Sequence, residues 1–259
     1  MAEAQKIYLI TGANRGIGLA LVDAIVSKYP TSFVYAGVRD PSLAKSTAQL
    51  DGLIAKYPGR VEVVKCVSAD KEDNDALAKQ IGQRWGRIDV VIANAGISNS
   101  VSKVHETPIA QFEDHFSINV LGPIALFQAF YDLLKASPHQ PRFIPISSGC
   151  GSLVIMPPLP LEVSAYGTSK AALNWATRKI HFENEWLVSF PLCPGAVGTD
   201  MVGHSISLDK SGNMGEYFSQ TIPRPPSVAA GMLLDIIMNA TRENEGGQFV
   251  NIEGGRHPW

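Results

Sequence analysis

The chain has 259 residues, of which 45% are hydrophobic and 18% are charged, with 22 Lys and Arg against 24 Asp and Glu. This composition excludes a disordered chain, and its near-neutral charge provides no basic surface for nucleic acid or anionic membranes. No window reaches the roughly 18 apolar residues of a membrane span, so we expect a cytoplasmic protein with neither nucleic acid nor membrane as partner. The residues Cys66, Cys150 and Cys193 lack paired spacing, and the six histidines are scattered, so we expect free thiols and no metal.

Short apolar runs alternate with longer amphipathic segments along the chain. The runs are typical of buried parallel strands and cover Ile7–Ile10, Phe33–Val38, Val61–Val67, Val90–Ala93, Phe143–Ile146, Trp186–Leu192 and Phe249–Ile252. Apolar residues at helical spacing predict helices over Gly18–Lys28, Asp73–Trp85, Ile109–Ala136, Tyr166–Glu185 and Ser227–Ala240. We therefore predict one α/β domain over residues 1–259, a Rossmann-type doubly wound parallel sheet of about seven strands with helices on both faces.

Two segments fit no regular element. Residues 149–165 are rich in proline, and residues 201–226 are rich in Ser, Gly and Pro. Both follow predicted strands on the side where open α/β sheets bind ligands, so we expect a substrate wall and a lid. The wall is apolar and has no Lys or Arg, which favours an apolar substrate, although many of these side chains are equally explained as core. Within a central strand, Pro145 predicts a local irregularity.

A glycine-rich segment, Thr-Gly-Ala-Asn-Arg-Gly-Ile-Gly at residues 11–18, follows the first strand and opens a helix. In this context Gly12 permits a tight turn, Gly16 lets a diphosphate approach the backbone, and Gly18 lets helix and strand pack closely. A P-loop is excluded because no Gly-Lys-Ser/Thr follows. The segment predicts a dinucleotide site, the alternative being a turn that only connects strand to helix.

The second strand ends at Arg39, where an acidic residue would bind the ribose 2′-hydroxyl of NAD. A guanidinium pairs instead with a 2′-phosphate, and Arg15 in the glycine loop provides a second cation, so NADPH is favoured over NADH. Two alternatives remain open. Arg39 is also explained as a solvated charge, and Asp40 as an NAD contact, although Asp40-Pro41 is typical of a helix cap.

Tyr166 and Lys170 lie four residues apart, which places them on one face of a predicted helix. A neighbouring ammonium lowers the pKa of a phenol from about 10 and makes it usable as an acid or base near neutrality. Such a pair also occurs by chance in ordinary amphipathic helices. Its significance comes from the glycine loop and from further motifs at the ends of three strands: Asn94-Ala95-Gly96, Ser147-Ser148 and Pro194-Gly195-Ala196-Val197-Gly198-Thr199.

Together, Thr-Gly-x3-Gly-x-Gly, Asn-Ala-Gly, Tyr-x3-Lys and Pro-Gly-x-Val-x-Thr resemble the short-chain dehydrogenase/reductase family over essentially the whole chain. The resemblance implies that Tyr166 donates a proton, that Lys170 lowers its pKa and holds the nicotinamide ribose, and that Ser148 polarises the carbonyl. Ser147 remains a competitor, because Ser148 precedes Tyr166 by 18 residues, which is a long gap. Asn119 resembles the asparagine that supports a water path to the lysine, the alternative being a helix asparagine satisfied by backbone.

The resemblance also implies the cofactor contacts. They are assigned to Asn14 and Ile17 in the glycine loop and to Asn94, Ala95, Gly96, Pro194, Gly195, Val197 and Thr199, beside Tyr166 and Lys170. The third strand lacks the aspartate that the family often uses near adenine, unless Asp70 reaches back.

The implied activity is hydride transfer from reduced nicotinamide to an apolar ketone or aldehyde, as in Sniffer-type carbonyl reductases and fungal norsolorinic-acid-ketoreductase-like enzymes. The alternatives are an NAD-dependent secondary-alcohol dehydrogenase and an NADPH-binding sensor or scaffold without turnover. The resemblance also implies a homodimer or homotetramer built through the helices predicted over Ile109–Ala136 and Tyr166–Glu185, whose apolar faces are equally explained as core.

Overall fold

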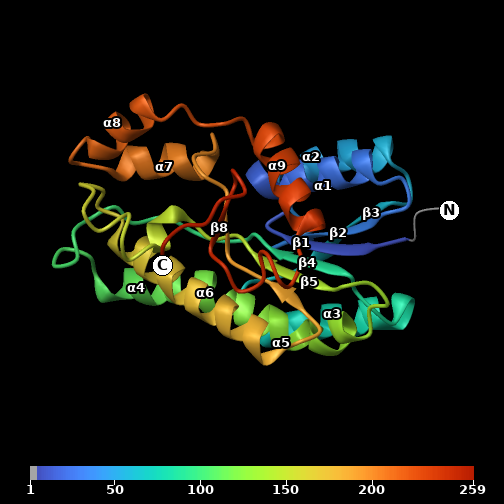
Figure 1. The fold of residues 1–259 in the computed structure, drawn as a ribbon. Coiled ribbons are helices and arrows are strands. Elements are labelled where there is room, and N and C mark those ends of the chain that lie inside the picture. The colour runs from blue at the N-terminus through green and yellow to red at the C-terminus, as the bar shows by residue number, and fades with distance from the viewer. Residues whose placement is uncertain (1–4) are drawn as a thin grey trace.

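A computed structural model describes residues 5–259, the side chains of residues 44–46 excepted, and is built on a six-stranded sheet of order β3-β2-β1-β4-β5-β6 (Figure 1). Every pairing within this sheet is parallel. The strands are β1 Ile7–Thr11, β2 Phe33–Val38, β3 Val61–Lys65, β4 Val90–Ala93, β5 Arg142–Pro145 and β6 Val188–Ser189. The predicted fold class is confirmed, although the main sheet has six strands rather than about seven.

Helices cover both faces of the sheet (Figure 1). One layer consists of α1 Gly16–Lys28, α2 Ala44–Lys56 and α9 Pro226–Asn239. The opposite layer consists of α3 Lys71–Trp85, α4 Ile109–Phe116, α5 Gly122–Lys135 and α6 Ser164–Glu183. Two further helices, α7 Asp200–Leu208 and α8 Asn213–Gln220, lie beyond the carboxyl ends of the strands, away from the N-terminus.

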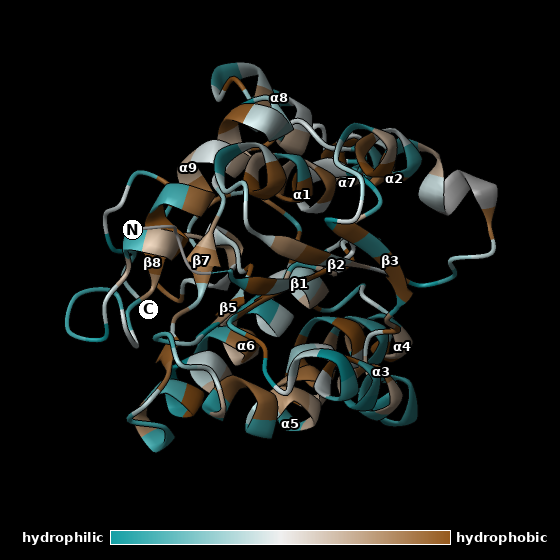
Figure 2. Ribbon diagram, turned by 90° about the vertical axis from the view of Figure 1, so that its right-hand side faces the viewer, coloured by the Kyte–Doolittle hydropathy of each residue, from teal (hydrophilic) through white to brown (hydrophobic). Residues whose placement is uncertain are grey.

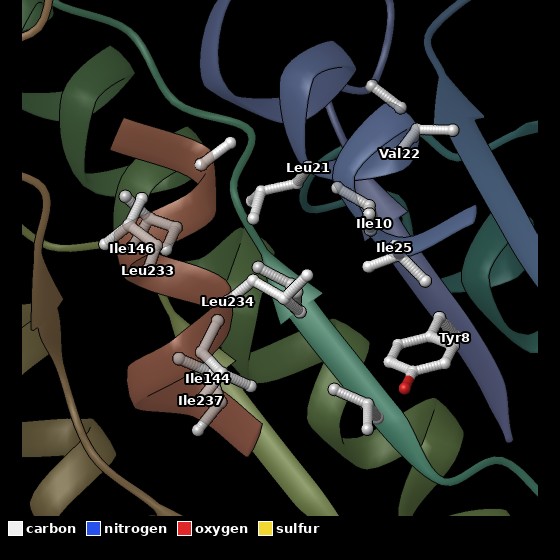
Figure 3. Packing of buried hydrophobic residues seen from close by; sticks show 14 of the residues in the cluster. Tyr8, Ile10, Leu21, Val22, Ile25, Ile144, Ile146, Leu233, Leu234 and Ile237 are labelled. Carbon is white, nitrogen blue, oxygen red and sulfur yellow. The ribbon is translucent and has the colours of Figure 1, made fainter. Parts of the chain in front are cut away.

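The alternation of side chains along β1 explains why both faces must be covered. Tyr8 and Ile10 belong to the core beneath α1 and α9, whereas Ile7 and Leu9 belong to the core beneath α3 and α5. Figure 3 shows part of the first cluster, and Figure 2 shows hydrophobic central strands between helices that carry both hydrophobic and hydrophilic residues. Burial of each such large side chain is worth about 1.5–3 kcal/mol, so a strand buried on both faces reads as an unbroken apolar run.

The predicted strand Trp186–Leu192 is wrong as a single element, because the chain forms β6 and then a separate strand β7, Leu192–Cys193. Strand β7 pairs with β8, Val250–Asn251, and reaches the main sheet through one bridge between Ile146 and Leu192. The break lies where Pro145 of β5 and Pro191 each lack an N–H donor for the ladder. The irregularity expected at Pro145 is present.

The helix predicted over Ile109–Ala136 is interrupted by a π-helical segment, η1, Ser117–Leu121. The N–H of Gly122 donates to the carbonyl of Ser117, five residues earlier, and Pro123 follows with no N–H of its own. A proline cannot carry the α-helical ladder, so the chain takes a wider turn before α5 begins. This turn carries Asn119.

Three further predictions about the elements need correction. Residues 201–226 contain α7 and α8 rather than irregular chain, and the Thr199 hydroxyl caps α7 by accepting the N–H of Val202 at 3.5 Å. Helix α2 was not predicted, because its stripe of apolar residues is sparse. It begins after Leu43, so Asp40 does not cap it; the Asp40 carboxylate instead accepts the N–H and the hydroxyl of Ser42.

The stretch Ile109–Lys135 is, in the described part of the chain, long and apolar enough to cross a membrane by length and composition. This criterion concerns mean hydropathy, and the stretch is not an unbroken run of about 18 apolar residues, so the prediction from the sequence is not contradicted. Core helices of globular proteins also meet this criterion, and α5 carries Leu126, Phe127 and Phe130 into the core beneath the sheet.

Candidate active site

The glycine loop turns at the carboxyl end of β1 with Gly12 and Gly16 in left-handed backbone conformations, at φ of 62° and 55°. Arg15 precedes α1 without a side-chain cap, and the first turn of α1 has no acidic residue. The first N–H groups of α1 are therefore available to an anion and lie at the positive end of the helix dipole. The loop fits a diphosphate.

Gly18 is buried where α1 packs on the turn. A Cβ atom at this position would lie 2.3 Å from the carbonyl oxygen of Gly12 and 2.6 Å from the Asn94 amide nitrogen. The close approach of helix and strand expected for this glycine is thus present. Asn14 is half-buried in the loop, and Ile17 packs against the core beneath α1.

Thr11, which sequence analysis did not single out, ties the glycine loop to the Asn-Ala-Gly turn after β4. Its hydroxyl accepts the N–H groups of Asn94 at 3.0 Å and Ala95 at 2.9 Å. The Asn94 side chain in turn donates to the carbonyl oxygens of Thr11 at 2.9 Å and Gly12 at 3.3 Å. The signal in the sequence was a hydroxyl directly before the first glycine.

Asn119 projects from η1 toward the loop that follows Gly96. Its side chain accepts the N–H of Ile97 at 2.8 Å and donates to the Ile97 carbonyl at 3.0 Å and to the Ser169 hydroxyl at 3.0 Å. A Cβ atom on Gly96 would lie 3.0 Å from the Asn119 amide oxygen and 3.7 Å from the Lys170 ammonium. Asn119 is therefore satisfied by a neighbouring loop and by α6, and it lies beside Lys170.

Tyr166, Lys170 and Ser148 come together at the carboxyl ends of the strands. Lys170 is buried; its ammonium lies 5.6 Å from the centre of the Tyr166 ring and donates to the carbonyl of Ile146 at 2.8 Å. The Ser148 side chain lies near Tyr166 and acts to lower its pKa. The Ser147 hydroxyl donates instead to the buried Asn174 side chain. Ser148 is thus the serine that faces the tyrosine.

Burial dominates the electrostatics of this group. It raises the pKa of Tyr166 above its usual 10 and lowers the pKa of Lys170 to about 8. The expectation that the ammonium lowers the pKa of Tyr166 is therefore wrong for this arrangement, because desolvation of the phenolate is the largest effect on that pKa and raises it. The phenol stays neutral near neutral pH, which is the state that can donate a proton.

Cys193 connects the serine turn to the segment after β7. Its buried sulfur accepts the N–H of Gly149 at 3.1 Å and the N–H of Gly195 at 3.5 Å. Burial raises the pKa of this thiol to about 11, so it remains an uncharged acceptor. Sequence analysis noted the cysteine but gave it no place in the site.

The Pro-Gly-x-Val-x-Thr segment passes over the glycine loop. Pro194 and Val197 are buried, Gly195 has a φ of 66°, and a Cβ atom on Gly16 would lie 3.4 Å from the Thr199 methyl group. The segment therefore brings the start of α7 against the beginning of α1.

The two candidate cations for a 2′-phosphate are both exposed. Arg39 lies at the end of β2 and has no ion-pair partner among the described residues, whereas the Arg15 guanidinium lies 3.5 Å from the carboxylate of Asp200 on α7. Asp70 caps α3 by accepting the N–H of Asp73, so it does not reach back to β3.

The predicted wall and lid touch each other and the loop after β4. Asn213 of α8 donates to the carbonyl of Pro160 at 2.9 Å. On α7, the buried Ser205 hydroxyl lies 3.1 Å from both the carbonyl and the hydroxyl oxygen of Ser98. Neither Ser98 nor Ser205 carried a signal in the sequence, because their proximity depends on how α7 folds over the sheet.

Residues 6–208 match the family model described as short chain dehydrogenase. Norsolorinic acid ketoreductase of Aspergillus parasiticus is 32% identical over 98% of this chain and 92% of its own length. The short chain dehydrogenase gsfK of Penicillium aethiopicum is 34% identical over 97% of this chain and 98% of its own length. The structure of NADPH-bound carbonyl reductase from chicken fatty liver superposes with a TM-score of 0.86 at 27% identity, covering 99% of this chain and 100% of that chain.

Proposed function

Because this chain belongs to the short-chain dehydrogenase family of oxidoreductases, we propose that it is an NADPH-dependent carbonyl reductase acting on apolar ketones or aldehydes. The observation that carries the proposal is the group formed by Ser148, Tyr166 and Lys170 at the strand ends, next to an uncapped helix N-terminus. Residues 149–165 form the substrate wall and residues 201–226 the lid of this site.

The described residues fit a dinucleotide. Gly12, Gly16 and the first N–H groups of α1 would hold its diphosphate, with Thr199 above them. Lys170 would hold the nicotinamide ribose, and Arg39 with Arg15 the 2′-phosphate. When bound, the reduced nicotinamide supplies the hydride. The chicken reductase similar to this chain is described as NADPH bound, which supports the same choice here.

The protein's own contribution is to bind the carbonyl and deliver a proton. The hydroxyls of Ser148 and Tyr166 donate hydrogen bonds to the carbonyl oxygen, where negative charge develops. Tyr166 then gives up its proton to that oxygen. Asn119 holds the loop against which the Lys170 ammonium lies.

An apolar substrate is supported by the wall, which has no Lys or Arg and exposes Leu153 and Val154. Two curated relatives bear names of ketoreductase or dehydrogenase type, and the first acts, by its name, on norsolorinic acid. We therefore expect bulky ketones to be the best substrates, and they should be tested first.

The test is a panel of apolar ketones and aldehydes, with NADPH or NADH consumption followed by absorbance and with chiral analysis of the products. We expect turnover with NADPH and weak turnover with NADH. Preference for NAD with a secondary alcohol would favour the dehydrogenase alternative. Tight NADPH binding without turnover of any panel member would favour a sensor or scaffold.

Replacing Arg39 by Asp is expected to shift the ratio of kcat/KM for NADPH over NADH about 10- to 100-fold toward NADH. A charge-assisted hydrogen bond to a phosphate contributes roughly 1.5–3 kcal/mol, and an aspartate repels the phosphate. Lys79→Asp on α3 makes the same charge change at an exposed position outside the site and serves as the control. An unaltered ratio in Arg39→Asp would show that Arg39 does not contact the phosphate.

We also propose that the protein is a cytoplasmic homodimer or homotetramer. A groove of about 380 Å³ between α4, η1 and α6 supports assembly through these helices. Phe116 and Leu121, which line it, are each 45% exposed in the single chain. Sedimentation equilibrium of the purified chain measures the assembly directly.

A further inference from the structure

His115 of α4 is a fully buried histidine beside the proposed proton donor. Its ring meets the Tyr166 ring edge-on, with 6.5 Å between centroids and 73° between planes. Nδ1 lies 2.6 Å from the carbonyl oxygen of Gln111, so this nitrogen carries the proton and donates. Nε2 is then an acceptor, and it takes the backbone N–H of Asn99 at 3.4 Å. The contacts fix both the tautomer and the orientation of the ring.

Hydrogen bonds from other elements hold three consecutive residues of the loop after β4, and His115 makes the third of these contacts. Ile97 is held by Asn119 of η1, Ser98 by Ser205 of α7, and Asn99 by His115. This loop directly follows Gly96, which lies against Lys170. Loss of the hydrogen bond between Asn99 and His115 would therefore affect the position of α7 and of the Lys170 ammonium as well as that of Tyr166.

The charged and titratable groups that face the ring come from two helices. Asp114 on α4 favours the protonated form, whereas Lys170 on α6 opposes it, and Tyr166 on α6 is neutral. Burial opposes protonation most strongly, and the pKa of His115 lies below the usual histidine value of 6.5. A proton on Nε2 would also turn an acceptor into a donor that points at the Asn99 N–H.

We propose that neutral His115 is a positioning residue for the reaction: through its Nε2 acceptor it holds the loop at residues 97–99 in place, and its protonation releases the loop. The proposal rests on the proposed function, because this loop follows Gly96, which lies against the ammonium of the proposed site. It predicts that kcat falls as pH drops below the histidine's lowered pKa, while NADPH affinity at neutral pH does not depend on His115.

The first test needs neither cofactor nor turnover. Nitrogen-15 NMR of the cofactor-free protein, with His115→Phe used for assignment, is expected to show an Nδ1-protonated neutral ring that resists protonation below pH 6.5. An ordinary titration near 6.5, or an Nε2-protonated neutral ring, would overturn the proposal.

The second test compares two variants. His115→Phe retains a ring against Tyr166 but has no acceptor, so kcat is expected to fall about 10- to 100-fold with the Kd for NADPH within about twofold. His115→Gln offers an amide oxygen to the Asn99 N–H and does not titrate, so kcat should return to within about threefold of wild type and lose its acid limb. His105→Phe, at an exposed position, is the control.

The outcomes separate the two proposals. If His115→Gln is as impaired as His115→Phe, or keeps the wild-type acid limb, the role given to His115 is wrong even though the enzyme turns over. If His115→Phe does not fold, the glutamine variant and the NMR titration still decide. Absence of any carbonyl turnover in the wild type would count against the proposed function. The NMR measurement would still show whether the His115 ring is neutral and protonated on Nδ1.

Discussion

Replacing Tyr166 by Phe is expected to lower kcat for carbonyl reduction by about 10²- to 10⁴-fold, the range typical of a lost general acid. The phenyl ring retains the edge-on contact with His115 and the position beside the Lys170 ammonium, while the hydroxyl that faces Ser148 is removed. The Kd for NADPH, measured by fluorescence, should stay within about threefold, because the glycine loop is untouched.

Tyr131→Phe on α5 provides the matched control. Its ring packs against Phe127 and Trp186, which are not part of the site, so loss of this hydroxyl should leave kcat unchanged. If Tyr166→Phe reduces ketones as fast as wild type, the tyrosine is not the proton donor and the proposed mechanism fails.

Replacing Gly18 by Ala is expected to disrupt the cofactor site more than any other single methyl group in the glycine loop. The added Cβ would lie 2.3 Å from the Gly12 carbonyl oxygen, a backbone atom that cannot move without displacing the turn. Overpacking of this kind costs about 1–3 kcal/mol of folding stability. We expect this loss in urea denaturation, together with a rise of tenfold or more in the Kd for NADPH.

Gly52→Ala on α2 is the control, because it adds the same methyl group to a helix glycine outside the site. Among the described residues, its own helix backbone and chain neighbours excepted, no heavy atom lies within 4 Å of its added Cβ, and alanine in a helix is favoured over glycine by about 1 kcal/mol. This variant should be slightly stabilised and should bind NADPH as wild type does. Wild-type affinity in Gly18→Ala would mean that the close approach at Gly12 is not needed for the site.

The central strands were predictable because their signal is local. Strands β2 and β4 are buried on both faces, so Phe33–Val38 and Val90–Ala93 read as unbroken apolar runs with the observed boundaries. The positions of Gly12, Gly18 and Asn94 were predictable for a related reason: each belongs to a short motif at a strand end, and the residues of such a motif determine the conformation of the turn.

The features of the fold and site that could not be predicted depend on contacts between segments far apart in the sequence. The π turn at Asn119 follows from Pro123 and from hydrogen bonds to Ile97, and neither alters the helical spacing of apolar residues. The choice of Ser148 over Ser147 needed the position of Asn174 on α6. The raised pKa of Tyr166 follows from burial, and the four-residue spacing of Tyr166 and Lys170 does not show how deeply the pair is buried.

The break between β6 and β7 has a consequence for the order in which the protein matures during synthesis. Strand β7 leads into the segment over the glycine loop, and its ladder partner is β8, Val250–Asn251, near the end of the chain. Before residue 250 emerges from the ribosome, a nascent chain contains all six strands of the main sheet but lacks the ladder partner of β7. We therefore expect the segment over the glycine loop to become fixed only after the main sheet has formed.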